Sequence, residues 1–421
     1  MPALCHRPDG LASLYLMRSA DALASTTATY AIPLLVLITT GSTALTGLAF
    51  LLEWTPRLGA FTFAGALSDR FGAGRVFRCT NFFRATVVGL AAALLTALPS
   101  AGTATTTIVL AFGGVSGLLA EVSFVAVETL GAEAGRHLGD RAHRVQAAQT
   151  GIDQGAVLLG PLLGGVLLLA GPGVLLAVVA LLAMTAAAAT QDDAVPANRH
   201  RAPSSLLTGW RTLRGTPALA WLIGGLAASN LASGVLQAAA PITVIHRFHY
   251  STADVGAVWS AAAVASLLAV IAARRAIDRW SVWPVGAVTA GVSTVACLGV
   301  ALAPGFAAYT GAVAALMAAE GALTVVLRTL RARLIPATAF GSTLAVTIIL
   351  VLLPLPVAGA LVAAVPAAGL PHLLLACAVL QGLVLTACFH GLRRHRTVCE
   401  PAPSKVIAAR RAEPIQPADA P

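Results

Sequence analysis

Long apolar segments alternate with short polar connections along almost the whole chain. Each segment holds about 20 or more mostly apolar residues, which at 1.5 Å per residue is enough to cross a hydrocarbon core of about 30 Å. Six lie in the first half, at about 11–38, 44–64, 76–98, 105–130 and 145–170 and, after a turn at Gly171, up to Thr190. Six more follow, at about 218–245, 254–273, 282–303, 305–327, 338–365 and 369–392. The pattern predicts twelve membrane-spanning helices.

The longest polar stretch, 191–216, divides the segments into two sets of six. The sets repeat weakly, because Leu23-Ala-Ser25 returns as Leu231-Ala-Ser233 and Ala120-Glu121 returns as Ala319-Glu320. Parallel repeats of this kind build two six-helix bundles related by a pseudo-twofold axis, with a cleft between them. We therefore expect an N-terminal bundle over 1–190, a linker over 191–216, a C-terminal bundle over 217–392 and a disordered tail over 393–421.

Composition supports a membrane protein. Of the 421 residues, 57% are hydrophobic and only 10% are charged, whereas a soluble domain has about 25% charged residues. A transmembrane barrel would show strands of about 10 residues with alternating polarity, and these segments are continuously apolar instead. The expected fold class is an all-α membrane protein.

The distribution of basic residues predicts the orientation. A net charge of +10 would suggest nucleic-acid binding in a soluble protein. The arginines, however, gather in alternate loops, and the opposite set of loops contains only Arg247. Because cytoplasmic loops carry the excess of positive charge, we expect a multi-pass protein of the cell membrane with both termini and the linker in the cytoplasm, and no nucleic-acid partner.

A charged, glycine-containing loop connects the second and third segments. Its marked residues are Gly65, Asp69, Arg70, Gly72 and Arg75, and a weaker copy after the eighth segment contains Asp278 and Arg279. An aspartate here can accept hydrogen bonds from a facing helix N-terminus, and glycines permit a tight turn and close helix approach. We interpret the loop as the latch of a cytoplasmic gate. The alternative is a solvated turn that only follows the positive-inside rule.

The fifth segment combines glycines with a proline. The residues concerned are Gly151, Gly160, Pro161, Gly164 and Gly165. A Gly-Pro step can kink a helix, and small residues let a neighbouring helix pack closely. The pattern favours a specialised helix. The alternative is composition alone, since Gly and Pro are frequent in membrane helices.

Ionisable residues inside the spans are the main chemical signal, because each costs about 2.5 to 3.5 kcal/mol at a helix centre unless it is paired or hydrated. Counted from the cytoplasmic helix ends, one layer about 12 to 15 Å deep contains Asp21, Arg57, Arg84, Glu121 and Asp153. Glu53 lies one turn from Arg57 and can pair with it. In the second half only Glu320 lies at comparable depth.

This layer predicts where protons and substrate bind. With Glu53 included, the layer has four carboxylates and two arginines, so not every carboxylate can have its own cationic partner. A carboxylate that is left over can carry a proton. Asp21 is the first candidate, because Ser25, Thr26, Thr27 and Thr29 follow it and could line a hydrated cleft; Glu121 and Asp153 come next. The alternative is a static network of ion pairs that serves helix assembly.

The motifs resemble those of a known family. The loop Gly65-x3-Asp69-Arg70-x-Gly72 with Arg75 is similar to the signature between helices two and three of the major facilitator superfamily, although Ala73 and Gly74 stand where that family often has basic residues. Gly151-x8-Gly160-Pro161-x2-Gly164-Gly165 resembles the antiporter motif of its exporters. Within the family, Ala31-Ile-Pro33 and Leu159-Gly-Pro161 resemble the macrolide-efflux and siderophore-exporter type.

The resemblance implies a monomeric secondary transporter that exports a small lipophilic organic molecule, a drug or natural product, in exchange for protons by alternating access. Its partners would be this substrate, protons and the lipid bilayer, with the proton gradient in place of any cofactor. No enzyme or metal site is expected, because the sequence lacks a nucleophile elbow, a phosphate loop and a paired CxxC, and His246 and His249 lack a third ligand. The alternatives are a nutrient importer and a non-transporting membrane sensor on the same fold.

Overall fold

The computed structural model describes residues 8–97, 102–138, 142–190, 206–335 and 340–394. All regular elements in these ranges are helices. The first half contains α1 (Pro8–Thr40), α2 (Thr43–Phe71), α3 (Ala73–Ala97), α4 (Thr103–Leu138), α5 (Ala142–Leu169) and α6 (Pro172–Ala189). After α7 (Leu206–Gly215), the second half contains α8 (Pro217–Ile242), the π-helix η2 (Thr243–Arg247), α9 (Thr252–Trp280), α10 (Val282–Leu302), α11 (Phe306–Leu334), α12 (Phe340–Leu352), α13 (Pro354–Ala364), the 3-10 helix η4 (Ala367–Gly369) and α14 (Leu370–Arg394).

The predicted all-α membrane fold is confirmed. Within the described ranges, 11 segments are long and apolar enough to cross a membrane, and α12 and α13 together form one of them. The twelfth span is α2, which is 29 residues long. Its apolar run is interrupted, because its central turns carry Glu53 and Arg57.

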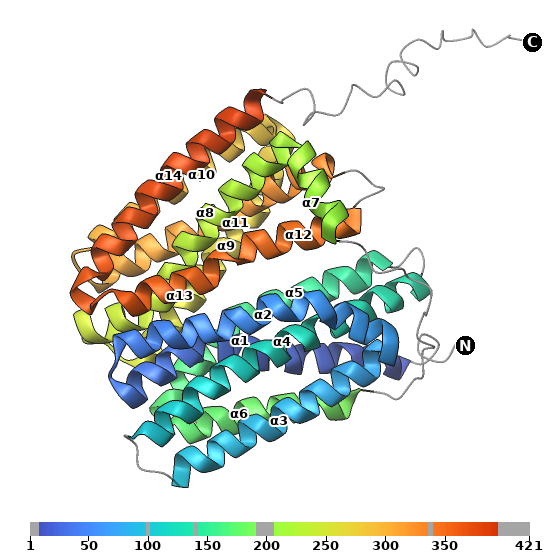
Figure 1. Ribbon diagram of the computed structural model, residues 1–421, viewed down its shortest axis with the longest axis vertical. Coiled ribbons are helices and arrows are strands. Elements are labelled where there is room, and N and C mark those ends of the chain that lie inside the picture. Colours follow the sequence, from blue (N-terminus) through green and yellow to red (C-terminus); the bar gives the residue numbers. More distant parts are fainter. Residues whose placement is uncertain (1–7, 98–101, 139–141, 191–205, 336–339, 395–421) are drawn as a thin grey trace, which may run out of the picture.

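The helices form two bundles that meet closely at one end and separate toward the other (Figure 1). One bundle contains α1–α6 and the other contains α8–α14. We call the end that carries Arg70, Arg75, Arg279 and Arg394 the basic end. The opposite end, where α2 begins and α13 ends, is called the closed end.

Two pairs of helices make the most extensive contacts between the bundles, toward the closed end: α2 with α13, and α5 with α9. A Cβ built on Gly359 would lie 2.5 Å from the backbone nitrogen of Leu51 and 2.8 Å from the carbonyl oxygen of Gly47. In the second pair, a Cβ on Gly256 would lie 2.5 Å from the carbonyl oxygen of Pro161. Both crossings therefore depend on glycine, because the facing backbones leave no room for a side chain.

The structure differs from the sequence prediction in the linker 191–216 and in the span 338–365. Part of the polar stretch 191–216 is helical, since α7 spans 206–215, buries Leu213 and packs against α12; residues 191–205, like the tail from 395 on, lie outside the described residues. The apolar segment 338–365 is also interrupted, because α13 begins at Pro354, which has no N–H for the helical ladder.

Candidate functional site

A cavity of about 370 Å³ lies between the bundles. Along α2 and α5 it lies on the basic-end side of the glycine crossings, because it is lined by Trp54 and Arg57 rather than Gly47, and by Asp153 and Val157 rather than Gly165. The polar lining comes almost entirely from the N-terminal bundle, with Gln237 of α8 from the other side. The remaining polar side chains are Arg18, Asp21, Ser25, Thr26, Thr29 and Glu121, and the aromatic ones are Tyr30, Trp54 and Phe124.

Asp21 is held in a buried network beside this cavity. Its carboxylate lies 3.6 Å from the Nη1 atom of Arg84 and accepts a hydrogen bond of 2.8 Å from the Ser123 hydroxyl. Arg84 is fully buried and also donates to Ser25 at 2.8 Å. Within the described residues, two further guanidinium nitrogens of Arg84 have no hydrogen-bond acceptor. Asp21 is therefore the main counter-ion of a buried arginine.

Glu53 and Arg57 form the ion pair that their spacing predicts, at 2.9 Å along α2. Arg57 also donates to the Thr29 hydroxyl of α1 and lies 4.5 Å from the ring centre of Trp54. The Glu53 side chain is completely buried, with 0% exposure. This pair ties α2 to α1 at the wall of the cavity.

A third arginine, Arg18, enlarges the predicted layer. It donates to both carboxylate oxygens of Asp153, at 3.0 and 2.6 Å, and also to Glu128. The count of two arginines against four acids is therefore wrong, because α1 brings Arg18 onto the acids of α4 and α5. Asp153 and Glu128 share this buried arginine. The available signal was that Arg18 lies three residues before Asp21, on nearly the same face of one helix.

Glu121 differs from the other acids of the layer. It lines the cavity and is 9% exposed, and within the described ranges it has no hydrogen bond or ion pair. Arg57 and Asp21 are the charged groups that act on it electrostatically. The structure thus brings together all six predicted residues of the N-terminal layer, and leaves Glu121 as the acid without a cationic partner.

Glu320 lies apart from this layer, inside the C-terminal bundle. It accepts hydrogen bonds from Ser293 of α10 and Gln381 of α14, and Gln381 also donates to Ser293 at 2.8 Å. Glu320 is only 8% exposed and Gln381 is fully buried. No arginine or lysine in the described part of the chain pairs with it.

The glycines of the fifth span divide among different neighbours. Gly160 and Gly164 pack on Thr26, Thr27 and Ala31 of α1, whereas Gly165 packs on the start of α9. Thr252 of α9 donates to the Gly165 carbonyl at 2.8 Å. A Cβ at Gly151 would meet nothing within 4 Å. Close packing therefore holds for the later glycines and not for Gly151, which lies where the bundles separate.

The predicted gate loop is exposed at the basic end. Asp69, Arg70 and Arg75 are exposed, as are Asp278 and Arg279 in the second copy. Gly72 supplies the tight turn with a φ of 88°. A Cβ at Gly65 would have no neighbour within 4 Å, so the predicted close helix approach at Gly65 is wrong for this arrangement, in which the bundles are apart at this end.

Comparison with known proteins identifies the family. The sequence model of the Major Facilitator Superfamily matches residues 14–358, and no curated protein matches the chain. A bacterial homologue of the iron transporter ferroportin in its inward-facing state has 15% identity and a TM-score of 0.68 over 90% of this chain and 98% of its own. The outward-facing state of that homologue has a TM-score of 0.57 and 15% identity, over 90% of this chain and 98% of its own.

The nucleoside transporter NupG, in a mutant form, has 10% identity and a TM-score of 0.71 over 90% of this chain and 99% of its own. At such low identity these structures show a common fold. The family match covers most of the chain and agrees with the two six-helix bundles and the cavity between them. The chain therefore belongs to the major facilitator superfamily and is a multi-pass membrane transporter.

Proposed function

We propose that this transporter exports a small lipophilic organic molecule in exchange for protons, and that Glu121 carries the exchanged proton. The observation that carries this proposal is the contrast among the acids at the cavity. Asp21, Glu53 and Asp153 each have an arginine partner, whereas Glu121 lines the cavity without one in the described residues. An acid that has no counter-ion but can reach water is suited to bind and release a proton.

The cavity is suited to a lipophilic substrate. Tyr30, Trp54 and Phe124 supply aromatic surface beside Glu121, and Ala22, Ala120, Val127 and Val157 add apolar surface between the polar groups. Aromatic and apolar walls with a few placed polar groups are typical of sites for small organic ligands. A substrate and a proton would then compete for the same cavity, which couples their movement in opposite directions.

The arrangement also supports alternating access. The closed end is sealed by the α2–α13 and α5–α9 crossings, and at the latter Ser260 donates to the Leu158 carbonyl at 2.7 Å. The basic end, which we assign to the cytoplasm from the positive-inside rule, has its loop around Asp69 exposed. We infer that the latch forms when the basic end closes and the glycine crossings at the other end separate.

Inverted membrane vesicles provide the test, with a substrate chosen by toxicity screening in a host that lacks its own pumps. An imposed proton gradient should drive substrate accumulation by the wild type. Glu121→Gln should abolish this accumulation and retain exchange of labelled for unlabelled substrate, because the cavity keeps its shape. Asp153→Asn, which removes a paired acid at the same cavity, is the matched comparison. Gradient-driven accumulation by Glu121→Gln at the wild-type level would refute the assignment.

A further inference from the structure

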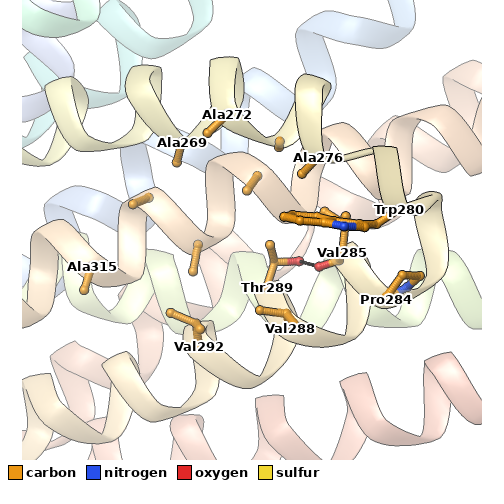
Figure 2. A pocket seen from close by; sticks show the side chains of 14 residues that line it. Ala269, Ala272, Ala276, Trp280, Pro284, Val285, Val288, Thr289, Val292 and Ala315 are labelled. Carbon is orange, nitrogen blue, oxygen red and sulfur yellow. Dashed lines mark hydrogen bonds between the residues drawn. The ribbon is translucent and has the colours of Figure 1, made fainter. Parts of the chain in front are cut away.

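The outer surface of the C-terminal bundle contains a second hollow. It lies among α9, α10 and α11, with a volume of about 660 Å³ (Figure 2). Alanines form much of its wall, including Ala269, Ala272 and Ala276 of α9 and Ala318 of α11. Small side chains on facing helices create this space, because a larger residue at any of these positions would fill part of it.

The hollow faces the lipid, and its polar lining groups are the Trp280 indole at one end and the Thr289 hydroxyl. Val288 of α10, at its rim, is 65% exposed. The hydroxyl of Thr289 donates to the backbone carbonyl of Val285 at 2.9 Å (Figure 2). Away from Trp280 the walls therefore give a polar ligand no free partner, and an apolar chain fits them.

The length and position of the hollow match one leaflet of a bilayer. Its lining along α9 runs from Ala269 to Trp280, which at 1.5 Å per residue is about 16 Å, or about half of a hydrocarbon core. Trp280 closes one end of the hollow, next to Pro284 (Figure 2), and it is the last residue of α9 at the basic end. Tryptophan favours the boundary between hydrocarbon and headgroups.

Positive charge lies at the same end. The guanidinium of Arg279 is 5.7 Å from the ring centre of Trp280. Arg275 lies one helical turn earlier, and both arginines are exposed. An apolar slot one leaflet long, ending at an interfacial tryptophan and two exposed arginines, is complementary to a lipid with an apolar tail and an anionic headgroup.

We propose that this hollow binds an anionic glycerophospholipid, with one acyl chain between α9, α10 and α11 and the phosphate at Arg275 and Arg279. The site is separate from the transport cavity, so it does not depend on the proposed substrate or on Glu121. Occupancy would fill the space between the helices of the C-terminal bundle from the lipid side.

Fluorescence quenching by lipids brominated on the acyl chain tests the site in purified full-length protein. The Trp280 signal is the difference between the wild type and Trp280→Phe. Brominated phosphatidylglycerol should quench this signal saturably and at lower mole fraction than brominated phosphatidylcholine. Arg279→Gln should weaken the preference for phosphatidylglycerol about fivefold. Ala318→Phe should remove the saturable phase, and Val295→Phe, which adds the same ring at a position 69% exposed and outside the hollow, should not.

Equal quenching by the two lipids would overturn the proposal, since it would indicate ordinary contact with bulk lipid. An unchanged saturable phase in Ala318→Phe would also overturn it. If Ala318→Phe fails to fold, Ala272→Leu fills the opposite wall with a smaller change and should give the same loss. Cross-linking of two copies through Val288 that excludes lipid would show that a second copy of this chain occupies the hollow instead.

Discussion

The two bundles bury acids at related positions but surround them differently. The alignment that pairs Leu23 with Leu231 pairs Asp21 with Ser229, and the alignment of the two loops pairs Arg84 with Ser293. The N-terminal ion pair of 3.6 Å is thus replaced by two serines bridged by Gln381, at 3.5 and 2.8 Å. The first repeat therefore has an ion pair beside the cavity, and the second has hydrogen-bonded neutral side chains at the corresponding positions.

This difference indicates which bundle can couple proton binding to substrate binding. Charges that line a cavity can exchange partners with protons, substrate or water, whereas Glu320 is enclosed by Ser293 and Gln381. The Gln381 amide nitrogen donates to Ser229 of α8 and Ser293 of α10 as well as to Glu320 of α11, so this network ties α14 to three other helices. The proton exchange proposed above therefore belongs to the N-terminal bundle, and the C-terminal bundle is suited to a rigid wall.

The largest effect is expected when the N-terminal ion pair is broken. Asp21→Asn leaves Arg84 buried without its counter-ion, and removing one partner of a buried pair costs about 3 to 5 kcal/mol. Thermal unfolding in detergent should show a large decrease in the midpoint. Glu320→Gln is the matched change in the other bundle and should cost about 1 kcal/mol or less, because an amide oxygen can accept the same hydrogen bonds. Equal losses in the two variants would contradict the contrast between the bundles.

The sequence predicts the membrane spans well, but it predicts few of the side-chain contacts between them. Twelve helices and two repeats follow from apolar segments, because each must cross the same thickness of hydrocarbon. The pairing of Arg18 with Asp153 joins α1 to α5, and no local pattern specifies such a contact. For the same reason the sequence favours Asp21 as the free acid, whereas the structure pairs Asp21 and leaves Glu121 without a cation in the described residues.

Neutral hydrogen-bond partners, helix breaks and empty space between helices are harder still to predict from the sequence. Ser293 and Gln381 carry no charge, so nothing in the sequence marks them as partners of Glu320. The break before Pro354 lies within a uniformly apolar segment. The lipid-facing hollow consists of missing volume between alanines on different helices, and missing volume depends on how the helices pack rather than on any one residue.

An intermediate effect is expected where the bundles touch. Gly359→Val places a side chain against the backbone of α2, where even a Cβ would lie 2.5 Å from the Leu51 nitrogen; overpacking of this kind costs about 1 to 3 kcal/mol. The cost applies only while the closed end is sealed, so the population should shift toward states in which this end is open. Spin labels at Ala44 and Ala368, on a background without native cysteines, should then report a longer distance component.

Gly151→Val is the control for this shift, because a Cβ at Gly151 meets nothing within 4 Å. Its distance distribution should match that of the parent protein. A longer component in both variants, or in neither, would show that the α2–α13 crossing does not hold the closed end.

The smallest effect is expected at the two turns that join the second and third spans of each repeat. Gly72 donates its N–H to the Ser68 carbonyl at 2.9 Å, and Ser281 donates to Ile277 at the same distance. Both residues have a positive φ, of 88° and 75°. Glycine adopts this conformation without a Cβ clash, whereas serine at φ 75° and ψ 169° occupies a region used almost only by glycine, at a cost of order 1 kcal/mol or more.

Ser281→Gly should therefore stabilise the protein by about 1 kcal/mol, because the relief of backbone strain exceeds the added freedom of the unfolded chain. The measurement is the midpoint of thermal unfolding in detergent. Ser281→Ala, which removes the hydroxyl but keeps the Cβ, should give no such gain, and Gly72→Ser should lose a similar amount in the first repeat. A gain in Ser281→Ala as large as in Ser281→Gly would mean that the hydroxyl, and not the backbone, distinguishes the two turns.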